Sequence, residues 1–305
     1  MAGLNFGFLS PYLKRQSWYQ FPSFLPDAWR YWRGPKVVGQ ILGEFADAQM
    51  TSGYGWQIPP HPEMLWNKTK QEQIWRNFLG ELQKEQIKIL GIERGSFFDP
   101  PLTLRNNHGF PGISDGKALE LLIFINRLHL ILRSYGITSQ KAKATIIWEE
   151  GNLGMICARL VAEQVRFLTL INPSIILLER AAGQIIAESG ISPQVNTELA
   201  SGMRGARLVI ICGRLIKYAE VFEQPRLIRC EIFGNRPSLI SMNFRLPLTI
   251  KHQQERLPFY PALTEAILRS AFNLEHGYWS GNELAVERVL KIGLFLKKLG
   301  LESRI

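Results

Sequence analysis

Short apolar runs separated by polar turns dominate the middle of the chain, from Lys143 to Asn235. Four of these runs, at residues 144–148, 165–171, 206–212 and 227–233, have the composition of buried strands. Between the first three, residues 155–164 and 173–189 have the length and apolar spacing of helices. Strands and helices that alternate in this way predict a parallel sheet with right-handed crossovers, and therefore a Rossmann-type arrangement.

The part of the chain before this region mixes strands and helices. Residues 1–65 are rich in aromatic residues, Pro and Gly, which predicts short strands and loops around an aromatic core. Residues 68–86 have apolar side chains at helical spacing, and residues 87–90 form a short apolar run that predicts a buried strand. A second helix is expected over residues 114–135, with Gly136 just after its end.

The last 45 residues again have helical periodicity, and Ser280-Gly281-Asn282-Glu283 has the form of a capping box. The expected fold class is therefore α/β, with a central Rossmann-type parallel sheet. We expect an N-terminal α/β region at 1–140, a Rossmann-type dinucleotide-binding domain at 141–245 and a C-terminal helical segment at 246–305.

Composition narrows the class of protein. Of the 305 residues, 46% are apolar and 20% are charged, as in an average soluble protein. The longest apolar stretch, residues 119–132, is too short to span a bilayer, and residues 1–10 lack the features of a secretory signal. These features predict a soluble, cytoplasmic protein without a transmembrane segment.

Cysteine and histidine usage argues against metal and disulfide chemistry. Cys157, Cys212 and Cys230 form no Cys-x-x-Cys pair, and the five histidines are scattered. No metal site and no disulfide are expected. The net charge of +10 suits an anionic partner, such as an acidic carrier protein or a nucleotide. No nucleic-acid motif accompanies this charge, so specific nucleic-acid binding is not expected, and nothing indicates an oligomeric state.

A dinucleotide fingerprint places three glycines between a strand and a helix. The first permits a tight turn, the second lets backbone amides approach a pyrophosphate, and the third packs the helix on the strand. Here the corresponding segment is Glu149-Glu150-Gly151-Asn152-Leu153-Gly154, in which Glu149 replaces the first glycine. Gly151, Asn152, Leu153 and Gly154 are therefore the candidate cofactor-binding residues of the turn.

The predicted second strand ends close to Asn172. An acidic residue there would bond the ribose hydroxyls of NAD and repel the 2′-phosphate of NADP, so a neutral Asn172 suits NADP. The alternative is that Asn172 or Ser174 merely caps the next helix. Glu149 weakens the expected site, since a carboxylate about 5 Å from a phosphate charge costs about 3 kcal/mol at an effective dielectric of about 20.

Matches along nearly the whole chain resemble one family. They comprise Phe6-Gly7-Phe8-Leu9, the stretch from Ser52-Gly53 to Pro62-Glu63-Met64-Leu65, Ser114-Asp115-Gly116-Lys117-Ala118, Gly234-Asn235-Arg236-Pro237, Thr264-Glu265-Ala266-Ile267-Leu268 and Trp279-Ser280-Gly281-Asn282. In order and spacing they resemble the long-chain acyl-(acyl-carrier-protein) reductases, which make fatty aldehydes with NADPH. The resemblance implies an NADP cofactor and an acyl-thioester or acidic carrier-protein partner.

In that family a cysteine attacks the acyl thioester, and NADPH then delivers hydride to the acyl-enzyme. The resemblance puts this nucleophile at position 262, which is alanine here, and a methyl group cannot form a thioester. Cys212, at the end of a predicted strand, is the candidate substitute, although a small buried cysteine there is more often part of the core. Two hypotheses follow: a divergent NADP-dependent oxidoreductase acting on an acyl thioester or related carbonyl compound, and a non-catalytic relative that binds an acyl chain, a nucleotide or an acidic carrier protein.

Overall fold

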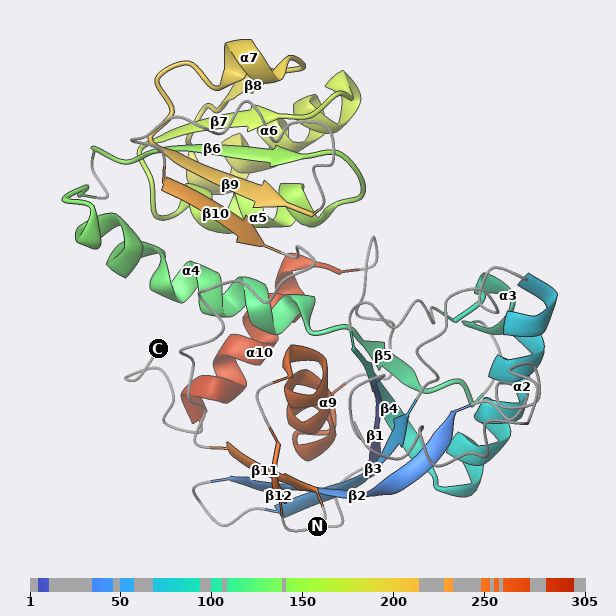
Figure 1. Ribbon diagram of the computed structural model, residues 1–305. Helices are drawn as coiled ribbons and strands as arrows, with labels where there is room; N and C mark the ends of the chain where they lie inside the picture. The colour runs from blue at the N-terminus through green and yellow to red at the C-terminus, as the bar shows by residue number, and fades with distance from the viewer. Residues whose placement is uncertain are drawn as a thin grey trace, which may run out of the picture. The chain divides into compact units, whose positions relative to one another are not determined.

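The computed structural model describes residues 5–10, 35–45, 50–57, 68–93, 100–105, 109–138, 141–213, 228–232, 248–252, 255–257, 260–274 and 284–298 (Figure 1). The chain forms two compact units. The mixed-sheet unit comprises Met1–Lys117, Arg245–Ser280 and Leu294–Leu301, and the parallel-sheet unit comprises Ala118–Phe244, Gly281–Gly293 and Glu302–Ile305. The units therefore interleave along the chain, whereas the expected segments 1–140, 141–245 and 246–305 follow one another.

The parallel-sheet unit has Rossmann topology. Its strands are β6 (Lys143–Trp148), β7 (Phe167–Ile171), β8 (Gln194–Asn196), β9 (Leu208–Cys212) and β10 (Ile228–Ile232). They are all parallel and lie in the order β10-β9-β6-β7-β8. The predicted parallel sheet is confirmed, with β6 between β7 and β9, as is the α/β fold class.

The helices of this unit alternate with the strands along the chain. Helix α4 (Lys117–Ser134) precedes β6, and it is followed by α5 (Leu153–Ala162), α6 (Ile175–Ser189) and the single-turn α7 (Leu199–Gly202). Because side chains alternate between the faces of a sheet, Ile147, Ile171 and Val209 share one face. They form a core cluster with Met203, which directly follows α7.

The described strands of the mixed-sheet unit form one seven-stranded sheet, in the order β12-β11-β2-β3-β1-β4-β5. These strands are β1 (Asn5–Ser10), β2 (Lys36–Phe45), β3 (Met50–Gln57), β4 (Ile87–Ile92), β5 (Gly112–Ser114), β11 (Leu248–His252) and β12 (Glu255–Arg256). Strands β3, β1, β4 and β5 are mutually parallel, whereas β2, β11 and β12 are added by antiparallel pairing.

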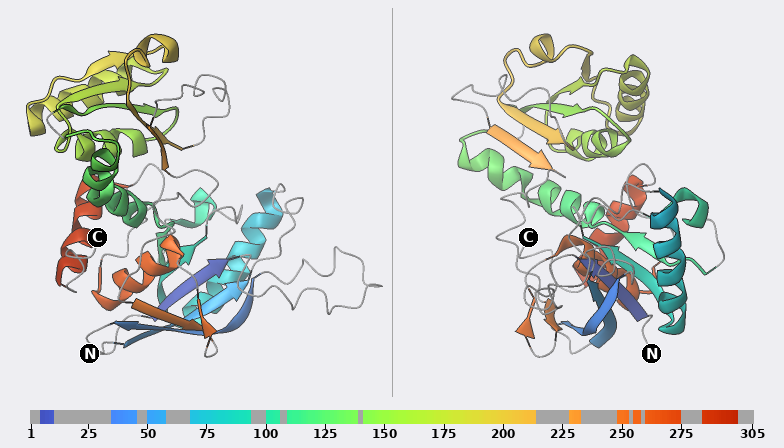
Figure 2. Two further views of the ribbon diagram at one scale, coloured as in Figure 1. Left: turned by 60° about the vertical axis from the view of Figure 1, so that its left-hand side comes forward. Right: turned by 45° about the vertical axis from the view of Figure 1, so that its right-hand side comes forward.

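Two helices cover opposite faces of this mixed sheet (Figures 1 and 2). Helix α2 (Lys68–Lys84) packs on the face that bears Leu9 and Trp56, with the Phe78 ring 5.5 Å from that of Trp56. Helix α9 (Pro261–Ala271) packs on the other face, against Gly91 of β4. The expected aromatic core is therefore present. The unit also contains the short α3 (Leu102–Arg105), and the last described helix of the chain is α10 (Val286–Lys298).

Several local expectations can be compared with this structure. Gly136, expected just after the helix over 114–135, has a positive φ of 68°. The C-terminal part, expected to be helical, contains α9 and α10 but also β11 and β12. The capping box at 280–283, and the family matches at 234–237 and 279–282, lie outside the described residues. Within the part that the structure describes, no helix is long and apolar enough to cross a membrane.

Candidate functional site

The carboxyl edge of the parallel sheet is the first candidate site. Strand β6 has β7 on one side and β9 on the other, so this edge contains the switch point at which Rossmann-type sheets bind ligands. The chain leaves β6 through Glu149 and Glu150, turns at Gly151 and enters α5 at Leu153. Gly151 has φ 72°, a left-handed conformation that favours glycine.

The amino end of α5 faces this turn without a side-chain cap. Asn152 stands at the cap position, but its side chain forms no capping bond, and the first turn of the helix contains no acidic residue. The Asn152 Nδ2 instead donates to the carbonyl oxygen of Leu284, at 2.7 Å. The first backbone N–H groups of an α-helix have no intrahelical partner, so this end has donors that suit an anion.

The third fingerprint glycine has a packing role. A Cβ atom at Gly154 would lie 2.2 Å from Cγ and 2.5 Å from Cβ of Trp148, the last residue of β6. Trp148 is only 1% exposed, and its indole Nε1 is buried and has no hydrogen-bond partner in the described structure. Gly154 therefore brings α5 close to β6, as expected of the third glycine. The contact with Trp148 is by itself sufficient to explain why this position is a glycine.

Asn172 connects three elements. It is fully buried; its Nδ2 donates to the carbonyl oxygen of Trp148 at 2.8 Å, and its Oδ1 accepts the backbone N–H of Ser174 at 2.8 Å. Ser174 caps α6, because its hydroxyl accepts the Leu177 N–H. These contacts agree with the alternative interpretation, in which Asn172 or Ser174 caps the next helix. Binding of ribose by Asn172 stays a prediction, and it would require the amide to leave at least one of these partners.

The two acids of the turn differ in exposure. Glu149 is half-buried and Glu150 is exposed. Neither carboxylate forms an ion pair with any residue that the structure describes. The repulsion between Glu149 and a phosphate bound at this turn stays a prediction.

The three cysteines come together inside this unit. Cys212 ends β9 and is 5% exposed, and its side chain lies beside that of Cys157 in α5. Burial raises the pKa of the Cys157 thiol well above its usual value, and the neighbouring Cys212 raises it further. Burial also raises the pKa of Cys230 in β10 to about 12. Cys157 and Cys230 therefore belong to the core; catalysis by Cys212 stays a prediction. No group of metal-ligating side chains occurs among the described residues.

A second polar cluster lies at the carboxyl edge of the mixed sheet. The hydroxyl of Ser114, at the end of β5, donates a short hydrogen bond to Oε1 of Glu265 in α9. Arg269, one turn later in α9, donates to the carbonyl oxygen of Ile113 at 2.7 Å. All three of these side chains, like that of Ser10 at the end of β1, are less than 1% exposed.

Ala262 occupies the first turn of α9, next to this polar cluster. A Cβ atom at Gly91 would lie 2.7 Å from the carbonyl oxygen of Ala262, and one at Gly116 would lie 2.5 Å from its backbone nitrogen. Two glycines therefore allow the first turn of α9 to approach the backbone of the sheet. Tyr260, just before this helix, has a pKa raised by burial and by the charge of Glu93.

The sequence predicted the turn after β6, but it did not predict most of the polar cluster of the mixed sheet. The phosphate turn is local, whereas Ser114 and Glu265 are far apart in the chain and meet only because α9 packs on the sheet. The polar residue at the end of each apolar run was the available indication. Lys117, in the segment 114–118 that resembles the reductase family, forms an ion pair with Asp115 at 2.6 Å.

No protein-family model and no curated protein matches the sequence. Among solved structures, quinate dehydrogenase from Corynebacterium glutamicum in complex with NAD is 10% identical, with a TM-score of 0.40 and coverage of 96% of this chain and 99% of that one. L-tryptophan dehydrogenase from Nostoc punctiforme is 13% identical, with a TM-score of 0.36 and coverage of 98% and 81%. Shikimate 5-dehydrogenase from Listeria monocytogenes in complex with shikimate and NAD is 10% identical, with a TM-score of 0.32 and coverage of 75% and 78%. Similarities this weak do not identify a substrate.

Proposed function

We propose that the parallel-sheet unit binds a nicotinamide dinucleotide, NADP, with its pyrophosphate at the turn of residues 149–152. The observation that supports this most is the left-handed Gly151 followed directly by the uncapped amino end of α5. Both features lie beside the switch point of a sheet with Rossmann strand order. When bound, NADPH supplies a hydride; the turn residues would only hold its phosphates.

The proposed binding is weak and selects NADP over NAD. Glu149 stands where the fingerprint has a glycine, and its half-buried carboxylate opposes a phosphate. Asn172 supplies no carboxylate that would repel a 2′-phosphate. Its amide already bonds Trp148 and Ser174, so it contributes little to ribose binding, which lowers the affinity further.

Calorimetric titration with NADPH tests this assignment. Glu149→Gly should strengthen binding by about 10- to 100-fold, because it removes a repulsive charge and frees the turn. Glu149→Gln removes only the charge, so it should give part of this gain, and the gain should shrink as salt rises. Glu150→Gln is the matched control, because it removes the exposed neighbouring charge. Equal affinity in the wild type and Glu149→Gly would refute the assignment of Glu149 to the phosphate site.

We propose further that the chain is a divergent relative of the acyl-(acyl-carrier-protein) reductases in which acyl transfer to a cysteine at position 262 has been lost. The amino end of a helix lowers the pKa of a cysteine thiol, so the first turn of α9 is a chemically suitable place for a nucleophile. Ala262 holds a methyl group there, 2% exposed. A retained role in binding an acyl chain or an acidic carrier protein is consistent with the net charge of +10.

Restoring the thiol tests this second proposal. Ala262→Cys, incubated with a long-chain acyl-coenzyme A, should gain one acyl group, detected by intact mass spectrometry and released by hydroxylamine. Ala266→Cys, one turn later in the same buried helix, is the control for non-specific acylation. An absence of acylation in folded Ala262→Cys, or equal acylation of both variants, would contradict it.

A further inference from the structure

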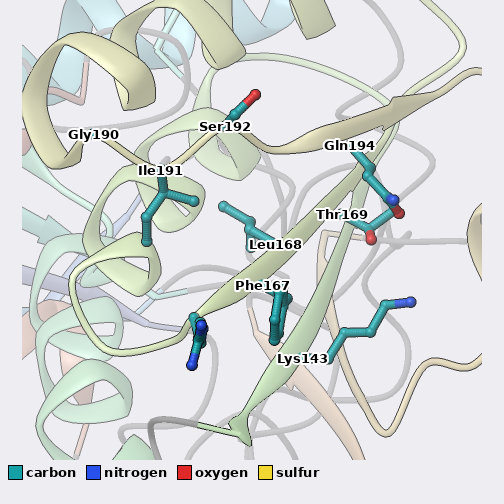
Figure 3. A pocket seen from close by; sticks show the side chains of 9 residues that line it. Lys143, Phe167, Leu168, Thr169, Gly190, Ile191, Ser192 and Gln194 are labelled. Atoms are coloured by element: carbon teal, nitrogen blue, oxygen red, sulfur yellow. The ribbon is translucent and has the colours of Figure 1, made fainter.

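A hollow opens at the amino edge of the parallel sheet, at the opposite ends of the strands from the phosphate turn (Figure 3). The pairing of β7 with β8 begins only at Thr169 and Gln194. Before that point, Phe167 and Leu168 of β7 diverge from the loop of residues 190–193 that leads into β8. The space between them has a volume of about 620 Å³, which is within the range of small-molecule sites.

The described charged residues of this hollow are all basic. Lys143 and Arg166 line it, and no acidic residue in the part of the chain that the structure describes does so. The Lys143 amine has one long contact, 3.4 Å to the carbonyl oxygen of Arg204. The guanidinium of Arg166 lies 5.5 Å from the centre of the Phe167 ring, and neither cation forms an ion pair with a carboxylate of any described residue.

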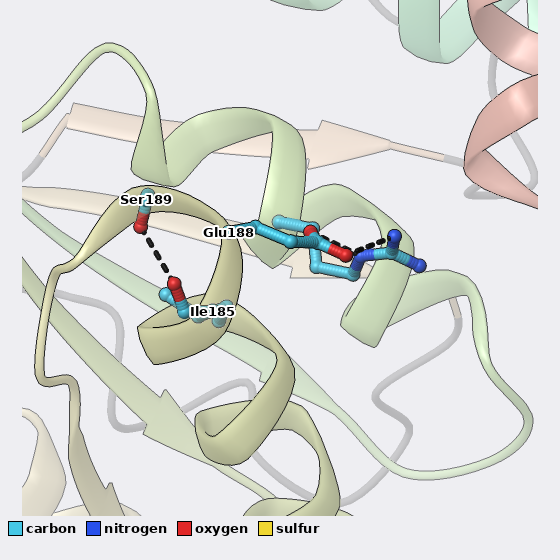
Figure 4. A network of polar contacts seen from close by, with 4 residues as sticks. Ile185, Glu188 and Ser189 are labelled. Carbon is cyan, nitrogen blue, oxygen red and sulfur yellow. Dashed lines mark hydrogen bonds and ion pairs between the residues drawn. The ribbon is translucent and has the colours of Figure 1, made fainter.

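The acid that precedes the loop is already engaged elsewhere (Figure 4). Glu188, near the end of α6, accepts two hydrogen bonds from Arg159 of α5, at 2.8 and 2.5 Å. This bidentate pair satisfies the carboxylate, so Glu188 does not neutralise Lys143 or Arg166. The hollow therefore keeps a local positive charge.

Local hydrogen bonds hold the loop that forms one wall. The Ser189 hydroxyl donates to the carbonyl oxygen of Ile185 at 2.8 Å and accepts the N–H of Ile191 at 3.4 Å. Gly190 has φ 71° and ends α6 in the left-handed conformation. A wall fixed in this way needs little ordering when a ligand binds, which favours affinity.

Apolar and polar surfaces meet around the basic pair. Phe167 is 53% exposed although it is a large aromatic residue at the start of a strand. Ile191 is half-buried on the opposite wall, and the hydroxyl of Ser192 and the amide of Gln194 are exposed (Figure 3). An exposed aromatic ring beside two cations can bind a planar ring and an anion at the same time.

We infer that this hollow is a second ligand site, which binds an organic phosphate with a planar ring, of the size of a mononucleotide. Lys143 and Arg166 bind the phosphate, Phe167 and Ile191 contact the ring, and Ser192 and Gln194 offer hydrogen bonds to its polar edge. The site is separate from the dinucleotide site, because all five strands are parallel and the phosphate turn lies at their other end. Its function is therefore regulatory binding or recognition of a second small molecule.

Titration with adenosine 5′-monophosphate tests the site in the full chain. The wild type should bind this probe, whereas inorganic phosphate and adenosine, which each lack one half of it, should bind at least about tenfold more weakly. Lys143→Gln with Arg166→Gln should weaken binding by about 10- to 100-fold, and Phe167→Ala by about tenfold. Lys141→Gln is the control for a general charge effect, because Lys141 is exposed two residues before Lys143 and does not line the hollow.

Three outcomes would overturn the inference. The first is no binding of the mononucleotide at millimolar concentration. The second is an equal loss in Lys141→Gln and in the double variant, which would indicate a general charge effect. The third is that the double variant Lys143→Gln with Arg166→Gln binds the mononucleotide as tightly as the wild type does, and that NADPH fully displaces it. This result would assign the binding to the phosphate turn. Far-UV circular dichroism of each variant verifies that it is folded.

Discussion

Replacing Gly154 with alanine should destabilise the protein, whereas the same replacement at Gly183 should stabilise it. Both glycines lie within helices, α5 and α6. In a helix, alanine is normally more favourable than glycine by up to about 1 kcal/mol, partly because it restricts the unfolded chain. A methyl group at Gly183 meets no atom within 4 Å, so this gain should be realised there.

The cost at Gly154 follows from its contact with Trp148. The added carbon would lie 2.2 Å from Cγ of the indole side chain, far inside van der Waals contact. The clash involves the base of a side chain that is 1% exposed, so the indole cannot turn away without opening the core. Overpacking of this kind costs about 1–3 kcal/mol. Because the gain in helix propensity is common to both variants, they should differ by about 1–3 kcal/mol in unfolding free energy.

Urea unfolding followed by far-UV circular dichroism measures this difference directly, with the m-value as a test that the two unfolding transitions are comparable. Gly183→Ala serves as the matched control for helix propensity. If Gly154→Ala is as stable as Gly183→Ala, Trp148 does not pack on α5 in the way described. The third glycine would then need another explanation, such as close approach of a ligand.

Three further predictions concern chemistry and stability. Purified protein should reduce neither long-chain acyl-carrier protein nor acyl-coenzyme A with NADPH, because position 262 lacks a thiol. Aldehyde formation above the no-enzyme control would refute this prediction. If Cys212→Ala then abolished that aldehyde formation, Cys212 would be identified as the nucleophile. The pKa of Cys230 is raised from 9.0 to about 12, so its contribution to stability is complete below pH 9 and is lost as pH rises towards 12. Between pH 9 and pH 12 the unfolding free energy should therefore fall more steeply in the wild type than in Cys230→Ala, by up to about 1.4 kcal/mol per pH unit. Parallel curves of unfolding free energy against pH would contradict the burial of this thiol. Asn172→Ala should cost about 1–3 kcal/mol in urea unfolding, because the carbonyl oxygen of Trp148 and the N–H of Ser174 lose their partner; an unchanged midpoint would show that water replaces the amide.

Local patterns predicted the parallel-sheet unit well. Strands β6, β7 and β9 are apolar runs between turns, and each of them is largely buried, so the hydrophobic pattern was sufficient to find them. Strand β8 was missed because its three residues are largely exposed, so it has no apolar pattern. Its position depends on pairing with β7, which no local pattern indicates.

The mixed-sheet unit was harder to predict, for a different reason. Its strand order brings β11 beside β2 and β1 between β3 and β4, and these neighbours are distant in the chain. The sequence indicated short strands there, but it contains no local information about which of them pair. The same limit applies to the site: the turn at Gly151 could be read directly, whereas the bond between Ser114 and Glu265 required the sheet.

The interleaving of the two units sets an order for folding during synthesis. Ser114 and Glu265 are 151 residues apart, and nearly the whole parallel-sheet unit, Ala118–Phe244, lies between them. At about 5–20 residues per second, a ribosome takes about 8–30 s to extend the chain from Ser114 to Glu265. Until then, the face of the mixed sheet that bears Phe8 and Gly91 lacks the helix that buries it. The unit that the chain begins first is thus the one that it finishes later, and a nascent chain stopped before Pro261 exposes an uncovered apolar sheet to chaperones and to other chains.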